Sequence, residues 1–466
     1  MLSSRLPKDL SPSPFFAELE RTKAAVLAEC AVADGRVGNA VRLPFIDMTV
    51  SSPVKAGLPI DLDAAVEETR KDFGCWNPDA AGWKSAREVV VEYYRERGGN
   101  FTAGQIILTA STSEAYSVLF KTFCDPGDVI LTPMPGYPLL DTLAQLEHLE
   151  CAPYFLKLKR EKKKGVILEP KAIESMDPIA STMLQGDNKG CFRFVLDSDS
   201  LLAAPEKAKI LLLVSPHNPT GHCVSREEWN AAVRFCEENN LILVVDEVFG
   251  DYAFSPEVRR SWEYVFGGKR DSRLCGNDCG RESLWDAGGG DFINLPEDGP
   301  KCPIFWLNGL SKAVGSPQLK LGWMAFYAPR ERFEEIRAAL EFVEDAYLSV
   351  SAPAQALGTA LLPKATAYEA RVKERLLQNW QTLREAFPSK YCPEVLGGWY
   401  AVVRLGEDDE ELTLRLLKEK HVLVQPGFFF DFDEDGWVVI SLLQEPALFK
   451  EAISRIRVGD PRSSRG

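Results

Sequence analysis

The chain contains 466 residues, of which 45% are hydrophobic and 26% are charged, and this length accommodates two domains with a substantial core. The formal net charge of -14 argues against nucleic acid or an anionic membrane as a partner, because both bind basic surfaces. No apolar stretch approaches the roughly 18 residues of a membrane span, and the amino terminus lacks the apolar core of a signal peptide.

The eleven cysteines are scattered and odd in number, which predicts reduced thiols in a cytoplasmic protein. Cys275 and Cys279 form the one close pair. A metal site usually needs two more ligands at short spacing. None follows nearby, so we expect no metal.

The first predicted elements are a helix over residues 15–33 and a short strand with a turn-rich loop within residues 43–59. A helix follows from residue 83 to about residue 97. A strand over residues 105–109 then leads to a Ser-Thr-Ser triplet at residues 111–113, where the next helix begins. Amides and hydroxyls at a helix start bind anions, although the same residue types are also plain helix caps.

Polar side chains follow three apolar strands at the point where each strand ends. They are Asn218 after the strand 209–214, Asp246 after the strand 241–245, and Lys312 shortly after the strand 304–307. Open α/β sheets bind ligands at the carboxyl ends of their strands. A single lysine at such a place usually extends its amine to solvent, whereas a partly desolvated lysine is a nucleophile that forms imines. A lysine for an aldehyde, a carboxylate for a pyridinium nitrogen and an amide for a phenolic oxygen together suit pyridoxal 5'-phosphate.

Beyond residue 328 the pattern predicts mainly helices. Amphipathic helices are expected over residues 331–347, 354–362 and 367–387, followed by a strand over 397–405, a helix over about 409–420, a strand over 437–443 and a last helix. Two polar segments rich in glycine and charge, residues 159–190 and 267–300, are predicted to be surface insertions.

In order and spacing, these motifs resemble the class I/II aminotransferases of the pyridoxal-phosphate fold-type I superfamily, the aspartate aminotransferase group, from about residue 43 to the end of the chain. The resemblance implies an α/β fold with a mostly parallel seven-stranded sheet in a large domain, residues 55–330. Residues 1–54 and 331–466 would form a smaller α+β domain. It also implies a homodimer with active sites at the subunit interface.

The resemblance also implies roles for individual residues. Lys312 would form the imine with the cofactor and then carry a proton from substrate carbon to cofactor carbon, while Asp246 would keep the ring nitrogen protonated. The other implied cofactor contacts are a phosphate cup of Ser111, Thr112 and Ser113, a stacking ring from Tyr137, and a hydrogen bond from Asn218 to the phenolic oxygen.

Two further candidates lie outside these motifs. Lys55 stands in a loop that crosses the active-site mouth in the resembling family, and Trp76 stands near an aromatic residue that reaches the phosphate of the neighbouring subunit. The commoner roles are a solvated lysine and simple aromatic packing, so both alternatives stay open.

The sequence departs from the family pattern at four positions. Lys320 replaces an arginine that grips the phosphate, and a lysine holds phosphate as a point charge only. Gly309 replaces a serine that contacts the phosphate, and Phe249 replaces a tyrosine that donates to the phenolic oxygen. Val439 stands where the family has the arginine that binds the substrate α-carboxylate. The cofactor chemistry is therefore expected to be intact, without the usual amino-acid clamp.

We therefore predict a pyridoxal-phosphate aminotransferase that moves an amino group from an amine or amino acid to a keto acid. Two alternatives stay open at this point. One is a lyase on the same scaffold, and the other is a non-catalytic protein that binds the cofactor.

Overall fold

The computed structural model describes residues 3, 5–7, 10–32, 43–161, 191–201, 205–255, 258, 260–266, 299–406 and 408–458. Most of the two predicted insertions, and both Cys275 and Cys279, lie outside these residues. Among the helices that are described, none combines the length and the apolar character needed to cross a membrane. The described side chains also contain no group of three or more His, Cys, Asp or Glu residues that could hold a metal ion.

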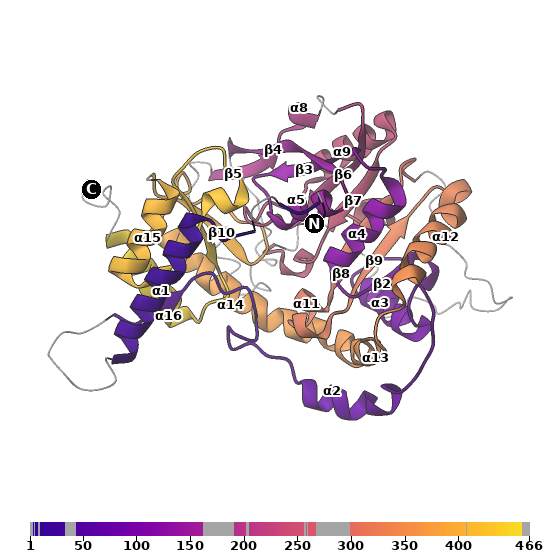
Figure 1. The fold of residues 1–466 in the computed structure, drawn as a ribbon, viewed down its shortest axis with the longest axis horizontal. Coiled ribbons are helices and arrows are strands. Elements are labelled where there is room, and N and C mark those ends of the chain that lie inside the picture. The colour runs from indigo at the N-terminus through magenta and orange to yellow at the C-terminus, as the bar shows by residue number, and fades with distance from the viewer. Residues whose placement is uncertain are drawn as a thin grey trace, which may run out of the picture.

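A mostly parallel sheet forms the centre of the molecule (Figure 1). Its described strands, in spatial order, are β2 (Ile106–Thr109), β9 (Gly322–Tyr327), β8 (Ile304–Gly309), β7 (Ile242–Asp246), β6 (Ala208–Val214), β3 (Val129–Met134), β4 (Glu150–Glu161) and β5 (Cys191–Leu196). The strands from β8 to β4 run parallel, whereas β9 is antiparallel to both of its neighbours and β5 is antiparallel to β4.

The predicted α/β class with a mostly parallel sheet is confirmed, but the sheet has one strand more than the seven expected. The additional strand is β5. It pairs with the second half of β4, from Leu156 opposite Leu196 to Glu161 opposite Cys191. This pairing covers backbone groups that β4 would otherwise expose as the edge of the sheet. Both strands border the segment predicted to be an insertion, and residues 159–161 of that segment belong to β4.

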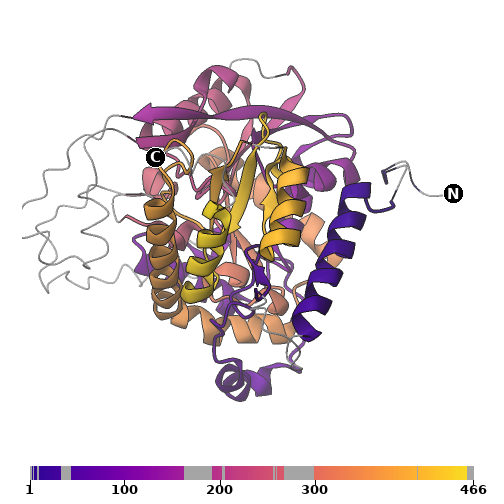
Figure 2. The same cartoon turned by 90° about the vertical axis from the view of Figure 1, so that its left-hand side faces the viewer.

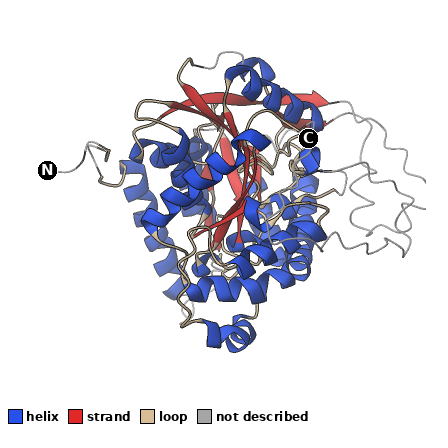
Figure 3. Ribbon diagram, turned by 90° about the vertical axis from the view of Figure 1, so that its right-hand side faces the viewer, coloured by secondary structure: helices blue, strands red, loops and turns tan. Residues whose placement is uncertain are grey.

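Both faces of the sheet are buried, because alternate residues of a strand point to opposite sides. In β8, Ile304 and Trp306 belong to one hydrophobic core cluster, whereas Phe305 and Leu307 belong to another. This explains why the strand is a continuous apolar run. Figure 3 shows helices on both sides of the strands. The first cluster includes side chains from α3 (Lys84–Glu96), α9 (Arg226–Asn239) and α13 (Ala352–Leu361), and the second includes side chains from α4 (Thr112–Phe123), α5 (Leu139–Leu146) and α12 (Arg330–Tyr347).

A second group of elements lies beside the large sheet (Figure 1). Its antiparallel sheet contains β10 (Tyr400–Arg404), β13 (Trp437–Ser441) and β12 (Gln425–Pro426), and its helices are α14 (Ala365–Ala386), α15 (Asp409–Lys420) and α16 (Pro446–Val458). The three helices expected between residues 331 and 387 correspond to α12, α13 and α14, with ends shifted by one or two residues.

The amino-terminal segment packs against this second group. The short strand β1 (Ile46–Asp47) pairs with β11 (Val422–Leu423), and Phe15 and Leu19 of α1 (Pro14–Val32) share a core cluster with Leu417 of α15. Figure 2 shows α1 alongside the carboxyl-terminal helices. Domain boundaries near residues 55 and 330 stay a prediction. The remaining short helices are α2 (Leu62–Thr69), α8 (Ser198–Leu201), α10 (Glu263–Phe266) and α11 (Leu310–Ala313).

Candidate active site

The three polar residues predicted from the strand ends lie at one edge of the central sheet. Asn218 follows β6, Asp246 ends β7, and Lys312 lies in α11 directly after β8. These strands are neighbours and run parallel, so their carboxyl ends meet. The charges of Asp246 and Lys312 are close enough to shift each other's pKa. The structure therefore brings the predicted carboxylate and amine together.

Two aromatic rings lie beside the Lys312 amine. Its Nζ lies 4.7 Å from the ring centroid of Trp399 and 5.2 Å from that of Phe249. The hydroxyl of Tyr252 donates to the Lys312 carbonyl over 2.6 Å, which fixes the backbone below the side chain. Burial lowers the pKa of Lys312 to about 8, although the Asp246 charge raises it. The amine thus loses its proton closer to neutral pH than an ordinary lysine, which makes it a better nucleophile.

Both oxygens of the Asp246 carboxylate accept hydrogen bonds. The hydroxyl of Tyr116 donates to Oδ2 over 2.7 Å, and the backbone amide of Val248 donates to Oδ1 over 3.0 Å. Burial raises the pKa of Asp246, while these two bonds and the Lys312 charge lower it. Tyr116 was missed in the sequence. The signal that could have found it is helical spacing. Tyr116 lies four residues after Thr112 on α4, so both side chains lie on the same helix face.

Several buried polar atoms near this edge of the sheet have no hydrogen-bond partner among the described residues. They include Oδ1 of Asn218 and Nε1 of Trp399. An unpaired polar atom in a protein interior costs about 1–3 kcal/mol. Such atoms at a functional site are explained most simply by a ligand that pairs with them. Their chemistry, an amide and an indole N–H beside a reactive amine, fits a polar cofactor or substrate.

The Ser-Thr-Ser triplet forms the amino-terminal end of α4. The Ser111 hydroxyl caps the helix by accepting from the Glu114 amide over 3.1 Å, and a Glu114 carboxylate oxygen accepts from the Ala110 amide. Thr112 and Ser113 occupy the first helical turn. A helix start with free amides attracts an anion. The cap interpretation is therefore correct for Ser111, and the anion-binding interpretation of the triplet stays a prediction.

A close glycine contact lies behind this helix start. Gly309 of β8 pairs with Gly322 of β9. A Cβ atom on Gly309 would lie 2.9 Å from the Gly322 Cα atom, closer than packing permits. A Cβ on Gly322 would lie 3.1 Å from the Ser111 carbonyl carbon. Gly309 therefore lets two strands approach each other. Lys320, in the turn between α11 and β9, is exposed.

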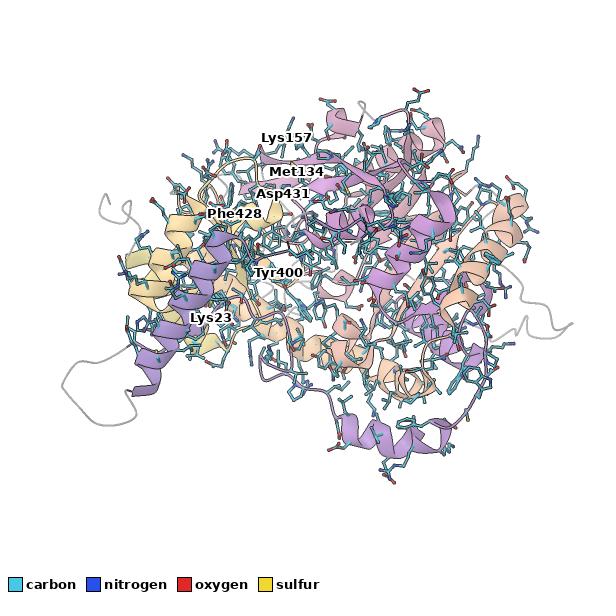
Figure 4. All side chains as sticks on the ribbon, in the orientation of Figure 1. Lys23, Met134, Lys157, Tyr400, Phe428 and Asp431 are labelled. Atoms are coloured by element: carbon cyan, nitrogen blue, oxygen red, sulfur yellow. The ribbon has the colours of Figure 1, made fainter. Side chains whose placement is uncertain are left out.

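Tyr137 lies at the junction between the large sheet and the second group of elements. The amide of Gly136 donates to the Phe430 carbonyl over 2.8 Å. Burial, and then the Asp246 charge, raise the pKa of Tyr137, so the ring is close to Asp246 although it is 48% exposed. Tyr137, Met134 and Asp431 line a cavity of about 210 Å³. Figure 4 shows Met134 above Asp431, with Tyr400 further below.

The remaining candidates are not brought into this cluster by any described contact. Trp76 is 77% exposed, and the Lys55 side chain is exposed in its loop. The loop itself is held to α14, because Arg375, Tyr368 and Arg371 donate to the carbonyls of residues 56, 58 and 59. Val439 is fully buried in β13 between Val402 and Gln425. No cation occupies that position.

With this geometry in view, comparison with known proteins identifies the family. The family model "Aminotransferase class I and II" matches residues 64–456. The chain belongs to the aminotransferase class I and II family. The sequence is 22% identical over 391 residues to the glutamate-pyruvate aminotransferase AlaA of Haemophilus influenzae, covering 81% of each chain. It is 24% identical over 428 residues to the tyrosine aminotransferase of Mus musculus, covering 88% of this chain and 80% of that one.

Solved aminotransferase structures share the fold. An aminotransferase from Escherichia coli superimposes with a TM-score of 0.69 at 18% identity, covering 98% of this chain and 97% of the other. The aspartate aminotransferase of Thermotoga maritima gives a TM-score of 0.68 at 19% identity, covering 98% and 99%. The predicted family, fold class and enzyme class, a transferase of amino groups, are therefore confirmed. The lyase and the non-catalytic alternatives are not favoured.

Proposed function

We propose that this aminotransferase moves an amino group from an amine or amino acid to a keto acid with pyridoxal 5'-phosphate bound at Lys312. The observation that carries the proposal is the Lys312 amine, which lies over the rings of Phe249 and Trp399 within range of the Asp246 charge, and whose pKa burial lowers to about 8. Aminotransferases of this family use pyridoxal phosphate. When bound, the cofactor supplies the aldehyde that accepts the amino group and the ring that withdraws electrons.

The residues beside Lys312 would divide the work of binding and proton transfer. The Lys312 amine would hold the aldehyde and, once free, move a proton away from the substrate carbon that bears the amino group. Asp246 would accept a hydrogen bond from the protonated ring nitrogen. The Nδ2 group of Asn218 would donate to the phenolic oxygen. Phe249 supplies no hydroxyl to that oxygen.

The other cofactor contacts follow from the helix start and the domain junction. Ser111, Thr112 and Ser113 would hold the phosphate at the amino terminus of α4, where backbone amides favour an anion. Lys320 would add a positive charge from the turn after α11. Tyr137 would stack on the ring, since its own ring is partly exposed near Asp246.

Chemical trapping tests this assignment directly. Borohydride treatment of the protein loaded with pyridoxal phosphate should attach the cofactor permanently to the peptide that contains Lys312, as mass spectrometry detects. Lys312→Ala should bind the cofactor without covalent trapping and should lose turnover, whereas Lys450→Ala on α16 should behave as the parent. Normal turnover by Lys312→Ala would overturn the proposal. Conversion of the bound cofactor to its amino form by the amine donor separates transamination from a lyase reaction.

The substrate carboxylate would be held differently from the usual arginine clamp. Val439 is buried and uncharged at the position where the family has that arginine. We propose two alternatives. Either Lys55 in the mouth loop supplies the charge, or the amino donor is an amine without an α-carboxylate. The exposed Lys55 side chain supports the first alternative, since it is free to reach an incoming ligand.

We also propose that the protein is a cytoplasmic homodimer. Trp76 is 77% exposed in the single chain, so its ring is available for contact with a partner subunit. A partner subunit that places its active site against this loop would bury the ring. Light scattering should give about twice the mass of one chain, and Trp76→Ala should weaken both assembly and cofactor affinity. A fully active monomer would contradict this part of the proposal.

A further inference from the structure

A tyrosine on the helix that begins with the Ser-Thr-Ser triplet reaches the carboxylate at the end of β7. Tyr116 lies on α4, three residues after Ser113, and its hydroxyl donates to Asp246 Oδ2 over 2.7 Å. Its ring is 5% exposed and packs within the core cluster between α4 and the sheet. The second carboxylate oxygen is held by the Val248 amide. With donors on both oxygens, the plane of the Asp246 carboxylate is fixed.

Packing alone does not explain why the Tyr116 hydroxyl bonds to a carboxylate. Tyr154 is buried to a similar extent, and its hydroxyl donates to a neutral backbone carbonyl, that of Leu212, over 2.9 Å. Tyr116 instead donates to a carboxylate, and a hydrogen bond to a charged group is about twice as strong as a neutral one. The Tyr116 hydroxyl keeps its proton, because burial, and then the Asp246 charge, raise its pKa well above the usual value. It therefore acts as a permanent donor.

We propose that Tyr116 is a positioning residue that orients Asp246 and keeps its carboxylate ionised, so that α4 controls the cofactor at two points. The amino terminus of the helix would hold the phosphate, and Tyr116 would set the strength of the bond between Asp246 and the ring nitrogen. This inference rests on the proposed role of Asp246.

The physical basis is a balance at Asp246 between burial and hydrogen bonding. A buried carboxylate is more basic than one in water, and a more basic carboxylate competes better for the proton on the ring nitrogen. Each donor to the carboxylate makes it less basic. Loss of the Tyr116 hydroxyl should therefore draw the shared proton from the nitrogen towards Asp246. The ring would then withdraw electrons less well, which slows the proton transfer at the substrate carbon.

The test follows the proton on the ring nitrogen. Parent protein is loaded with pyridoxal phosphate that carries ¹⁵N in the ring, and its NMR signal should fall in the range of a protonated pyridine. Tyr116→Phe removes only the hydroxyl, and its signal should shift towards neutral pyridine. Tyr154→Phe is the matched control, and its signal should stay at the parent position. We expect kcat of Tyr116→Phe to fall about tenfold or more, with KM within about twofold of the parent.

A second measurement keeps the inference testable if Tyr116→Phe fails to fold. Incorporation of 3-fluorotyrosine at position 116 keeps the hydroxyl but makes it a stronger donor, so the ¹⁵N signal should shift further towards the protonated form. A fluorinated protein whose ring signal is the same as that of the parent would overturn the role of Tyr116 alone. Absence of any bound cofactor in the parent would instead overturn the proposed function.

Discussion

Burial and the charge of Asp246 have opposite effects on the pKa of Lys312. Burial lowers the pKa of the amine to about 8, and Asp246 limits the decrease. In protein freed of cofactor, we expect an amine-reactive reagent to modify Lys312 half-maximally near pH 8, because the reactive neutral form appears above the pKa. The measurement is mass spectrometry of the Lys312 peptide over a pH series.

The Asp246→Asn variant is the control for the origin of this shift. It removes the charge that raises the Lys312 pKa, so the midpoint of modification should move below that of the parent. A parent midpoint near the ordinary lysine value of about 10.4 would show that the amine is fully solvated.

Lys55 provides the residue-level test of substrate choice. If its amine holds the substrate carboxylate, Lys55→Ala should lower kcat/KM for α-amino acids by about a hundredfold, the effect of losing an interaction of roughly 3 kcal/mol. Carboxylate-free amines should be unaffected, and Lys450→Ala should leave both classes unchanged. Equal losses for both classes would remove Lys55 from the site. Strong parent activity on carboxylate-free amines would favour the other alternative.

At the level of elements, the close approach of β8 and β9 depends on two glycines. A Cβ on Gly309 would lie 2.9 Å from the Gly322 Cα atom, so Gly309→Ala forces the strands apart. We expect this change to lower the free energy of unfolding by about 1–3 kcal/mol, the usual cost of overpacking. Urea denaturation of the cofactor-free protein measures it.

Gly74 offers a matched control, since no atom lies within 4 Å of an added Cβ there. Gly74→Ala should change the free energy of unfolding by less than about 1 kcal/mol. If Gly309→Ala proved equally harmless, the strands would have room for a side chain, and a serine at position 309 would be sterically permitted.

At the level of the whole molecule, a buried ionic cluster joins the sheet to α14. Arg97, which follows α3, bonds Asp251 Oδ1 over 2.9 Å and Glu369 Oε1 over 2.7 Å. Asp251 lies in the turn that follows β7, and β7 ends at Asp246. Glu369 lies on α14. Arg260 also pairs with Asp251. The cluster therefore connects the turn that begins at the candidate carboxylate to the second group of elements.

Arg97→Met should destabilise the protein by about 3–5 kcal/mol, because it leaves two buried carboxylates with one cation fewer. The control is Arg95→Met, whose pair with Glu92 is solvent-exposed and should contribute less than about 1 kcal/mol. Both values come from urea denaturation. Similar small losses for the two variants would mean that the cluster is effectively solvated.

Much of the fold followed from local patterns. The apolar run of β8 predicted a strand buried on both faces, and amphipathic spacing predicted α12, α13 and α14 closely. The strand β5 was not foreseen, because it forms by pairing with β4 across a long polar segment. Local composition carries no information about which edge a distant strand will join.

The sequence by itself determined the family, since Asn218, Asp246 and Lys312 each follow a strand in the order that a pyridoxal-phosphate site requires. Parallel strands necessarily bring such residues to one edge of the sheet. Only the tertiary structure decided which side chains surround them. Tyr116 and Asp246 are 130 residues apart, and Trp399 reaches Lys312 from beyond α14. These contacts depend on how helices and strands pack against each other, and periodicity along one segment does not specify that packing.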